Sequence, residues 1–174
     1  DGRGVNFIIE ANVFNGNGQA GGAAINLAAL SDSLVQNNLL YGNGASGIAL
    51  WDNDNLYDEP LEKSGPRTPE QVTGPEALPL FGCQNVTIRS NTVLMNRAGR
   101  PALQCGPGSF GCRVRNNILV NDGSPSFEVV PTAIYKLDAG YNAVNQIVYE
   151  GLAPALKSLA VSLPETRTTL GVTR

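Results

Sequence analysis

The stretch LVQNNLLYGNG at residues 34–44 decides the fold of this chain, because three other stretches repeat its pattern. These are FIIEANVFNGNG (7–18), TIRSNTVLMN (87–96) and RVRNNILVND (113–122). Each has a short apolar strand followed by an Asn, a second apolar pair, and a second Asn or Asp. A repeat of this kind is typical of a solenoid, in which each coil buries its apolar face against the next coil.

The first Asn of each stretch gives the length of the repeat. It recurs at Asn12, Asn38, Asn91 and Asn117, and Asn142 is the candidate for a fifth position. The steps are 26, 53, 26 and 25 residues, so the middle step contains one coil and an insertion of similar length. We interpret the Asn column as scaffold, because Asn tolerates the left-handed backbone of a tight turn and stacked amides bond from coil to coil.

Apolar and inward positions alternate with outward positions within each coil, which predicts short strands with one buried face. The residues five and three before each ladder Asn, such as Val86 and Ile88 before Asn91, are expected to point inward. A third strand is predicted at 24–27, 47–50, 102–105 and 126–129. Three short strands in a coil of roughly 25 residues predict an all-β parallel β-helix.

Length and composition predict one domain with a buried core, since the chain has 174 residues of which 42% are hydrophobic. We assign 1–150 to the β-helix, with an insertion at about 52–82, and 151–174 to a C-terminal cap and tail. The cap is predicted as a short helix, because apolar residues follow a helical spacing that ends before Pro164. These residues are Leu152, Leu156, Leu159 and Leu163.

Charge and hydropathy narrow the expected partners. A net charge of −3 and a pI near 4.9 argue against nucleic acid, because phosphate binding needs a basic face. The absence of a long apolar run argues against a membrane span. The chain begins within a repeat and shows no signal peptide, so we interpret it as a processed or partial chain.

Three stretches carry a resemblance to a known family. They are GGAAINLAALSDSLVQNNLLYGNGASGIALWDN (21–53), NVTIRSNTVLMNRAGRPALQC (85–105) and VRNNILVND (114–122). They resemble the right-handed parallel β-helix repeat proteins of the pectate-lyase-like superfamily over about residues 5–150. The resemblance implies a right-handed parallel β-helix of about five coils, a secreted protein of the extracellular space or periplasm, and a polysaccharide as partner. The superfamily includes lyases, hydrolases and epimerases as well as tailspikes and adhesins, so fold alone does not settle activity.

The resemblance also implies where a carbohydrate would bind. In that superfamily the groove runs over the outer face of the strand that corresponds here to the third predicted strand. Its floor in this chain would consist of Asn26, Ala49, Gln104 and Glu128. Trp51 would lie at its edge, and Arg97 and Arg100 would stand in one wall. We therefore take Asn26, Trp51, Arg97, Arg100, Gln104 and Glu128 as candidate substrate-binding residues.

The insertion opens with aromatic and acidic residues, which suit two kinds of ligand. Trp51 and Tyr57 offer faces for sugar stacking. The carboxylates offer the oxygen ligands that Ca²⁺ prefers, which makes Ca²⁺ the candidate cofactor. The candidate ligands are Asp52, Asp54, Asp58 and Glu59. The alternative interpretation is a solvated acidic loop, and it stays open.

Catalytic residues are not assigned. The chain has no His, which removes the commonest general base. Lyases of the superfamily often use Arg or Lys as base, yet none of the four floor positions is basic. If the chain is an enzyme, lyase- or epimerase-type chemistry is expected. Arg89, Arg113 and Arg115 form a basic stripe, but the alternation places them on the strand before the ladder Asn, facing away from the groove, where we expect ordinary solvated surface.

The three cysteines leave two alternatives. Cys105 and Cys112 both face inward in neighbouring strands, where either a disulfide or two buried thiols would fit. Cys83 remains at the foot of the insertion.

The N-terminal coil suggests a second functional class. Nothing in residues 1–4 is long enough to cover the strand edges and the apolar end of the first coil, which contains Phe7 and Ile9. We therefore expect these residues to be exposed or covered by another chain. The alternative to a carbohydrate-binding domain is a structural subunit, which associates end to end with itself or with an upstream part of the same precursor.

Overall fold

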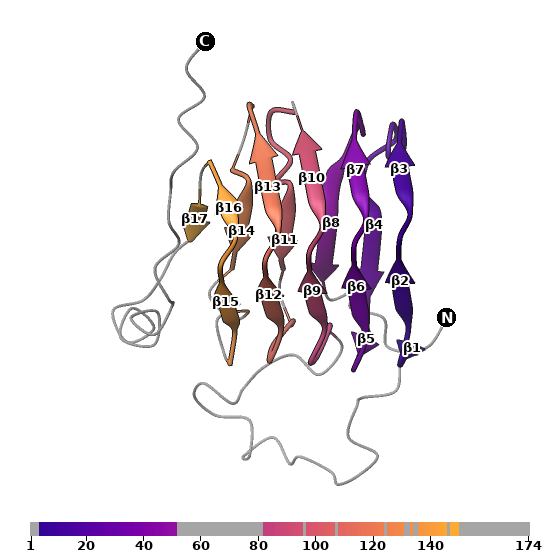
Figure 1. The fold of residues 1–174 in the computed structure, drawn as a ribbon, viewed down its shortest axis with the longest axis vertical. Helices are drawn as coiled ribbons and strands as arrows, with labels where there is room; N and C mark the ends of the chain where they lie inside the picture. Colours follow the sequence, from indigo (N-terminus) through magenta and orange to yellow (C-terminus); the bar gives the residue numbers. More distant parts are fainter. Residues whose placement is uncertain are drawn as a thin grey trace, which may run out of the picture.

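The computed structural model describes residues 4–51, 82–95, 97–106, 108–123, 125–130, 133, 136–145 and 147–149. In this part of the chain the fold is a parallel β-solenoid of about 4 turns with almost no helix. Three sheets of five strands form its sides, and strands of successive coils lie next to one another in each sheet (Figure 1). All strand pairs are parallel, as the repeat predicts. The predicted C-terminal helix and the insertion at 52–81 lie outside the described residues.

The sheets are named by their order within a coil. Sheet 1 contains β2 (Ile8–Glu10), β6 (Leu34–Gln36), β9 (Thr87–Arg89), β12 (Arg113–Arg115) and β15 (Asp138–Gly140). Sheet 2 contains β3 (Val13–Asn15), β7 (Leu39–Tyr41), β10 (Thr92–Met95), β13 (Ile118–Asn121) and β16 (Ala143–Val144). Sheet 3 contains β4 (Ala23–Ala28), β8 (Ser46–Trp51), β11 (Leu103–Cys105), β14 (Phe127–Val129) and β17 (Ile147–Tyr149). A small pair consists of β1 (Gly4–Val5) and β5 (Leu30–Ser31).

The core lies inside the three sheets and follows the predicted alternation. In sheet 1, Val35, Ile88 and Val114 are in register and fully buried, while their neighbours along each strand face outward. Sheets 2 and 3 bury their inward residues in the same way. Those residues include Leu40, Val93, Leu119, Ile48, Leu50, Leu103, Cys105, Phe127 and Val129. Burial of these columns across every coil interface is the main stabilising term of a solenoid.

The predicted Asn column forms a ladder between sheets 1 and 2, and Asn142 is its fifth member. Asn38 and Asn91 are 2% and 1% exposed. The Oδ1 atom of Asn91 accepts from the backbone N–H of Asn38 at 3.1 Å and from its side-chain amide at 3.0 Å. Asn91 Nδ2 donates to the carbonyl of Val35 at 3.0 Å. Each rung therefore satisfies buried backbone groups of the preceding coil.

The left-handed backbone of this turn lies one residue before the ladder Asn, which corrects the role given to Asn above. The residues with φ between 55° and 57° are Ala11, Asn37, Ser90, Asn116 and Tyr141. They turn the chain between sheets 1 and 2. The next residue can then point inward, where its amide reaches the coils on both sides. The left-handed turn and the amide bonding between coils, both attributed above to one Asn, thus belong to two neighbouring residues.

A second Asn ladder holds the turn between sheets 2 and 3, and it explains the second Asn of the repeat. Asn43 Oδ1 accepts from the N–H of Asn17 at 2.9 Å, and Asn43 Nδ2 donates to the carbonyl of Phe14 at 3.1 Å. In later coils Asn145 Oδ1 accepts from the N–H of Asn121 at 3.0 Å, and Asn145 Nδ2 donates to the carbonyl of Asn121 at 2.9 Å. Two ladders therefore fix two of the corners around which the strands are arranged.

At the end of the first coil, Phe7 is exposed as expected, whereas Ile9 is half-buried and packs against the core. Among the described strands, β2, β3 and β4 are the last members of their sheets. Phe7 is 54% exposed, and Val13 is 64% exposed. In the described part of the chain, no helix is long and apolar enough to cross a membrane.

Candidate functional site

Four outward positions of sheet 3 form the row that was predicted as the floor of a groove. Asn26 is in register with Ala49, which is in register with Gln104, and Gln104 is in register with Glu128. The row arises because the residues on either side are buried, as Leu103 and Cys105 are on both sides of Gln104. A side chain between two inward residues of a strand must face outward.

Gln104 and Glu128 are joined directly across the two strands. Gln104 Nε2 donates to Glu128 Oε1 at 2.7 Å, and both side chains are half-buried. The bond orients the carboxylate of Glu128. The second carboxylate oxygen and the side-chain amide oxygen of Gln104 can then accept hydrogen bonds from a ligand. This pair is the part of the row best suited to bind hydroxyl groups.

An open cavity of about 360 Å³ lies over the N-terminal part of this row. It is lined by four of the predicted residues together with small residues of β8 and of the turn before β4. The predicted residues are Asn26, Trp51, Arg100 and Gln104. Glu128 is connected to them through Gln104. The structure therefore brings an indole, two amides, a carboxylate and a guanidinium to one face.

Arg97 lies in a different place from the one the groove assignment gives it. It lines a separate hollow of about 420 Å³ beside Gln19, Asn43 and Met95. Its backbone N–H donates to Asn121 Oδ1 at 3.1 Å, so its backbone belongs to the second Asn ladder. Three residues further on, the chain reaches Arg100, and this arginine lines the cavity of sheet 3.

Trp51 ends β8 at the edge of the cavity. Its Nε1 atom is buried and has no hydrogen-bond partner in the described part of the chain. A buried indole N–H normally finds an acceptor. Gly106 lies directly against this residue, because a Cβ there would be 3.3 Å from Trp51 Cβ and 2.5 Å from the carbonyl oxygen of Leu50. The backbone at Gly106 therefore packs against the Cα and Cβ atoms of Trp51.

The candidate Ca²⁺ ligands lie outside the described residues. These are Asp52, Asp54, Asp58 and Glu59. Within the part of the chain that the structure describes, no group of three or more His, Cys, Asp or Glu side chains is arranged to hold a metal ion. Ca²⁺ binding by the insertion stays a prediction.

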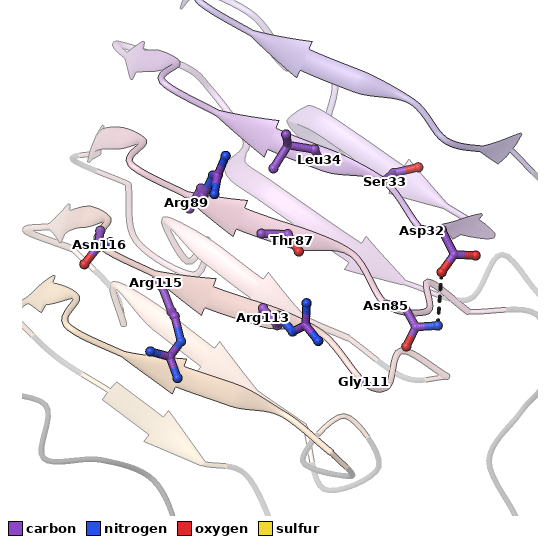
Figure 2. A pocket seen from close by; sticks show the side chains of 10 residues that line it. All are labelled: Asp32, Ser33, Leu34, Asn85, Thr87, Arg89, Gly111, Arg113, Arg115 and Asn116. Carbon is purple, nitrogen blue, oxygen red and sulfur yellow. Dashed lines mark hydrogen bonds between the residues drawn. The ribbon is translucent and has the colours of Figure 1, made fainter.

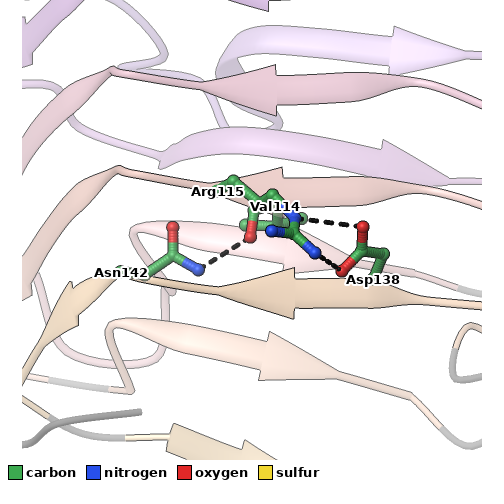
Figure 3. A network of polar contacts seen from close by, with 4 residues as sticks. All are labelled: Val114, Arg115, Asp138 and Asn142. Carbon is green, nitrogen blue, oxygen red and sulfur yellow. Dashed lines mark hydrogen bonds and ion pairs between the residues drawn. The ribbon is translucent and has the colours of Figure 1, made fainter. Parts of the chain in front are cut away.

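Sheet 1 carries a larger concavity, on a face that the sequence pattern assigns to ordinary surface. It has a volume of about 770 Å³ and contains the three arginines of the basic stripe (Figure 2). Arg115 is bound by Asp138, with Nε to Oδ2 at 3.0 Å and Nη2 to Oδ1 at 2.5 Å (Figure 3). This bond raises the pKa of Arg115 further, and the guanidinium also lies 5.8 Å from the ring centre of Tyr141. The sequence feature that could have indicated this hollow is the recurrence of Arg at outward positions of successive coils.

The three cysteines are buried, and no disulfide joins them to one another. Burial raises the pKa of Cys105 well above its usual range, and the nearby Cys112 adds to this effect. Burial also raises the pKa of Cys112 to about 12, although a backbone hydrogen bond from Val86 opposes the change. Thiols in this state stay protonated and act as small apolar core residues rather than as nucleophiles.

The chain matches no family model, no curated protein and no solved structure. The class of protein is therefore defined by the fold alone, which is a parallel β-solenoid.

Proposed function

We propose that this chain is an extracellular or periplasmic carbohydrate-binding β-solenoid, which binds a polysaccharide along the outer face of sheet 3. The observation that carries the proposal is the cavity in which Trp51, Arg100 and the amides of Asn26 and Gln104 converge. The resemblance to pectate-lyase-like repeats supports the same face. Lyase- or epimerase-type chemistry would require a base there, and Arg100 is the basic side chain that lines the cavity.

The chemistry of the row suits sugar hydroxyls. The amides of Asn26 and Gln104 can both donate and accept, and the bound carboxylate of Glu128 accepts. The indole of Trp51 supplies an apolar face for stacking against a sugar ring, while its Nε1 atom is buried. The row continues from coil to coil at the strand spacing of about 4.8 Å. An extended polymer can therefore contact Asn26, Gln104 and Glu128 along it, with Ala49 between the first two.

The test compares two aromatic truncations in a binding assay with acidic and neutral polysaccharides. Trp51→Ala is expected to weaken binding about tenfold, which corresponds to about 1.4 kcal/mol. Tyr41→Ala is the matched control, because Tyr41 faces outward from sheet 2 and lies outside the cavity. Gln104→Ala should weaken binding as well, since it removes an amide and releases Glu128.

Removal of about residues 55–80 tests the part of the proposal that concerns the insertion. The variant is expected to keep the circular dichroism of a folded β-protein and to lose polysaccharide binding. Binding that survives both this deletion and Trp51→Ala would contradict the proposal. So would the failure of the intact chain to bind any polymer of the panel.

The exposed end of the first coil favours a second candidate function, a structural subunit that associates end to end. Strands β2, β3 and β4 end their sheets in the described part of the chain, and their unpaired backbone groups can pair with another strand. Phe7 and Val13 add exposed apolar surface at this end. The expected partner is another copy of this chain, and the oligomeric state in solution tests it.

A further inference from the structure

The hollow on sheet 1 is built from the middle coils of the solenoid. Outward side chains of β6, β9 and β12 form its floor, including Leu34, Thr87 and Arg113, which are in register. Figure 2 shows the guanidinium groups of Arg89 and Arg113 on this face, on either side of Thr87. The face is separate from the cavity of sheet 3, and it shares no lining residue with it.

The three arginines of this hollow differ in how their charges are compensated. Asp138 binds Arg115 through two hydrogen bonds and compensates its charge. Arg89 Nε donates to Gln36 Oε1 at 2.8 Å, and Gln36 in turn donates to Glu10. Through these bonds Arg89 reaches the carboxylate of Glu10 only by way of the Gln36 amide, so Glu10 compensates its charge incompletely. Arg113 is exposed, and no side-chain hydrogen bond or ion pair of its guanidinium occurs among the described residues.

The register places the two incompletely compensated arginines at diagonal positions of neighbouring strands. Arg113 pairs with Thr87, and Arg89 is two residues further along the same strand as Thr87. Diagonal neighbours of this kind have backbones about 7–8 Å apart, within reach of long side chains. Arg89 is directed towards Gln36 on β6, and Arg113 lies on the other side of Thr87, on β12 (Figure 2). Anionic groups along one polymer can therefore contact the two guanidinium groups, with the Thr87 hydroxyl between them.

The acidic group on the rim indicates where an anion would lie. Asp32 is at the opposite end of the hollow from Asn116, and it accepts from Asn85 Nδ2 at 3.2 Å. Asp32 would repel an anion at its own end. The favourable position is therefore the one between Arg89 and Arg113.

We propose that this face of sheet 1 binds the anionic groups of an acidic polysaccharide, either uronate carboxylates or sulfate esters. Few charges are uncompensated here and the chain has a net charge of −3, which favours a polymer with modest charge density over nucleic acid. Guanidinium groups bind carboxylate and sulfate oxygens through charge-assisted hydrogen bonds. The hydroxyl of Thr87 and the amide of Asn85 supply neutral contacts to sugar hydroxyls.

The test measures binding of the full chain to immobilised polygalacturonate, lightly sulfated dextran and uncharged dextran at low and moderate salt. Arg113→Gln is expected to weaken binding to one or both acidic polymers about fivefold, and adding Arg89→Gln should weaken it further. The effect should shrink as salt rises. Lys136→Gln is the matched control, because it removes the same charge from an exposed residue outside both the hollow and the cavity of sheet 3. Arg89 and Arg113 are both exposed, so the melting temperatures of these variants should stay close to that of the wild type.

The outcomes separate this proposal from its competitors and from the site on sheet 3. Loss with carboxylated polymer alone, or with sulfated polymer alone, identifies the anion and supports the proposal. Equal loss with Lys136→Gln would show an effect of net charge and would overturn it, as would unchanged binding by the Arg113→Gln variant. Single-stranded DNA bound as tightly as the acidic glycans would also overturn it. Trp51→Ala should leave the salt-dependent loss caused by Arg113→Gln in place, because it changes a different sheet.

Discussion

Asn91 shows how much of a coil depends on one side chain. Its Oδ1 accepts from two groups of Asn38, and its Nδ2 lies within hydrogen-bond distance of Val35 O, Arg89 O and Asn117 Oδ1. These groups are buried or half-buried, so bulk water cannot replace the hydrogen bonds that they would lose without Asn91. The amide thus holds two coil interfaces at once.

We predict that Asn91→Ala lowers the free energy of unfolding by about 1–3 kcal/mol, because it leaves buried backbone groups unpaired. Asn12→Ala is the matched control at the exposed first rung, and it should cost less. Denaturant unfolding monitored by circular dichroism measures both. Equal costs at the two rungs would show that coil-to-coil bonding by the buried amide is not the source of the loss.

At the scale of the element, the corner between sheets 1 and 2 requires a left-handed residue in every coil. Asn37 and Asn116 occupy this position in two coils, and both tolerate it. Ser90 occupies it in the coil between them with φ of 55°. Its side chain is exposed, so a substitution there changes backbone strain with little effect on packing.

Ser90→Asn is therefore expected to stabilise the protein by about 0.5 kcal/mol, since Asn adopts this conformation at lower cost than most residues. Ser90→Val should destabilise it by more than about 1 kcal/mol, because β-branched residues strongly disfavour positive φ. Thermal unfolding of the two variants gives the comparison. A stabilising Val would contradict the assignment of strain to this corner.

At the scale of the whole molecule, the solenoid has one end in which apolar residues and strand edges meet. Phe7, Ile8 and Val13 are all exposed there. The outer face of sheet 2 adds exposed Leu39, Leu94 and Ile118. Exposed apolar surface next to unpaired strand edges favours association.

Sedimentation velocity across a range of protein concentrations is expected to show self-association of the 174-residue chain. Val13→Lys should reduce it, because a charge on an edge strand opposes edge-to-edge pairing. Lys substituted for Ile118, which lies in the inner strand β13 of sheet 2, is the control for a general gain in solubility. A stable monomer at high concentration would refute association through this end.

The sequence by itself determined which residues face inward, where each coil turns, and which outward residues share a row. A period of two fixes the face of each residue, and the repeat length fixes which residues of successive coils lie side by side. These two regularities of the sequence are enough to predict the Asn ladder and to align Asn26, Ala49, Gln104 and Glu128, and the strand register confirms that alignment.

Only the tertiary structure decided which of these side chains meet. It joined Gln104 to Glu128, placed Arg100 in the cavity of sheet 3, and placed Arg97 in a neighbouring hollow. It also paired the charge of Arg115 with Asp138, whereas Arg113 has no such ion pair among the described residues. The physical reason is that a repeat specifies the backbone position of each residue. The direction of a long side chain and its choice of partner depend on what the neighbouring coils present to it.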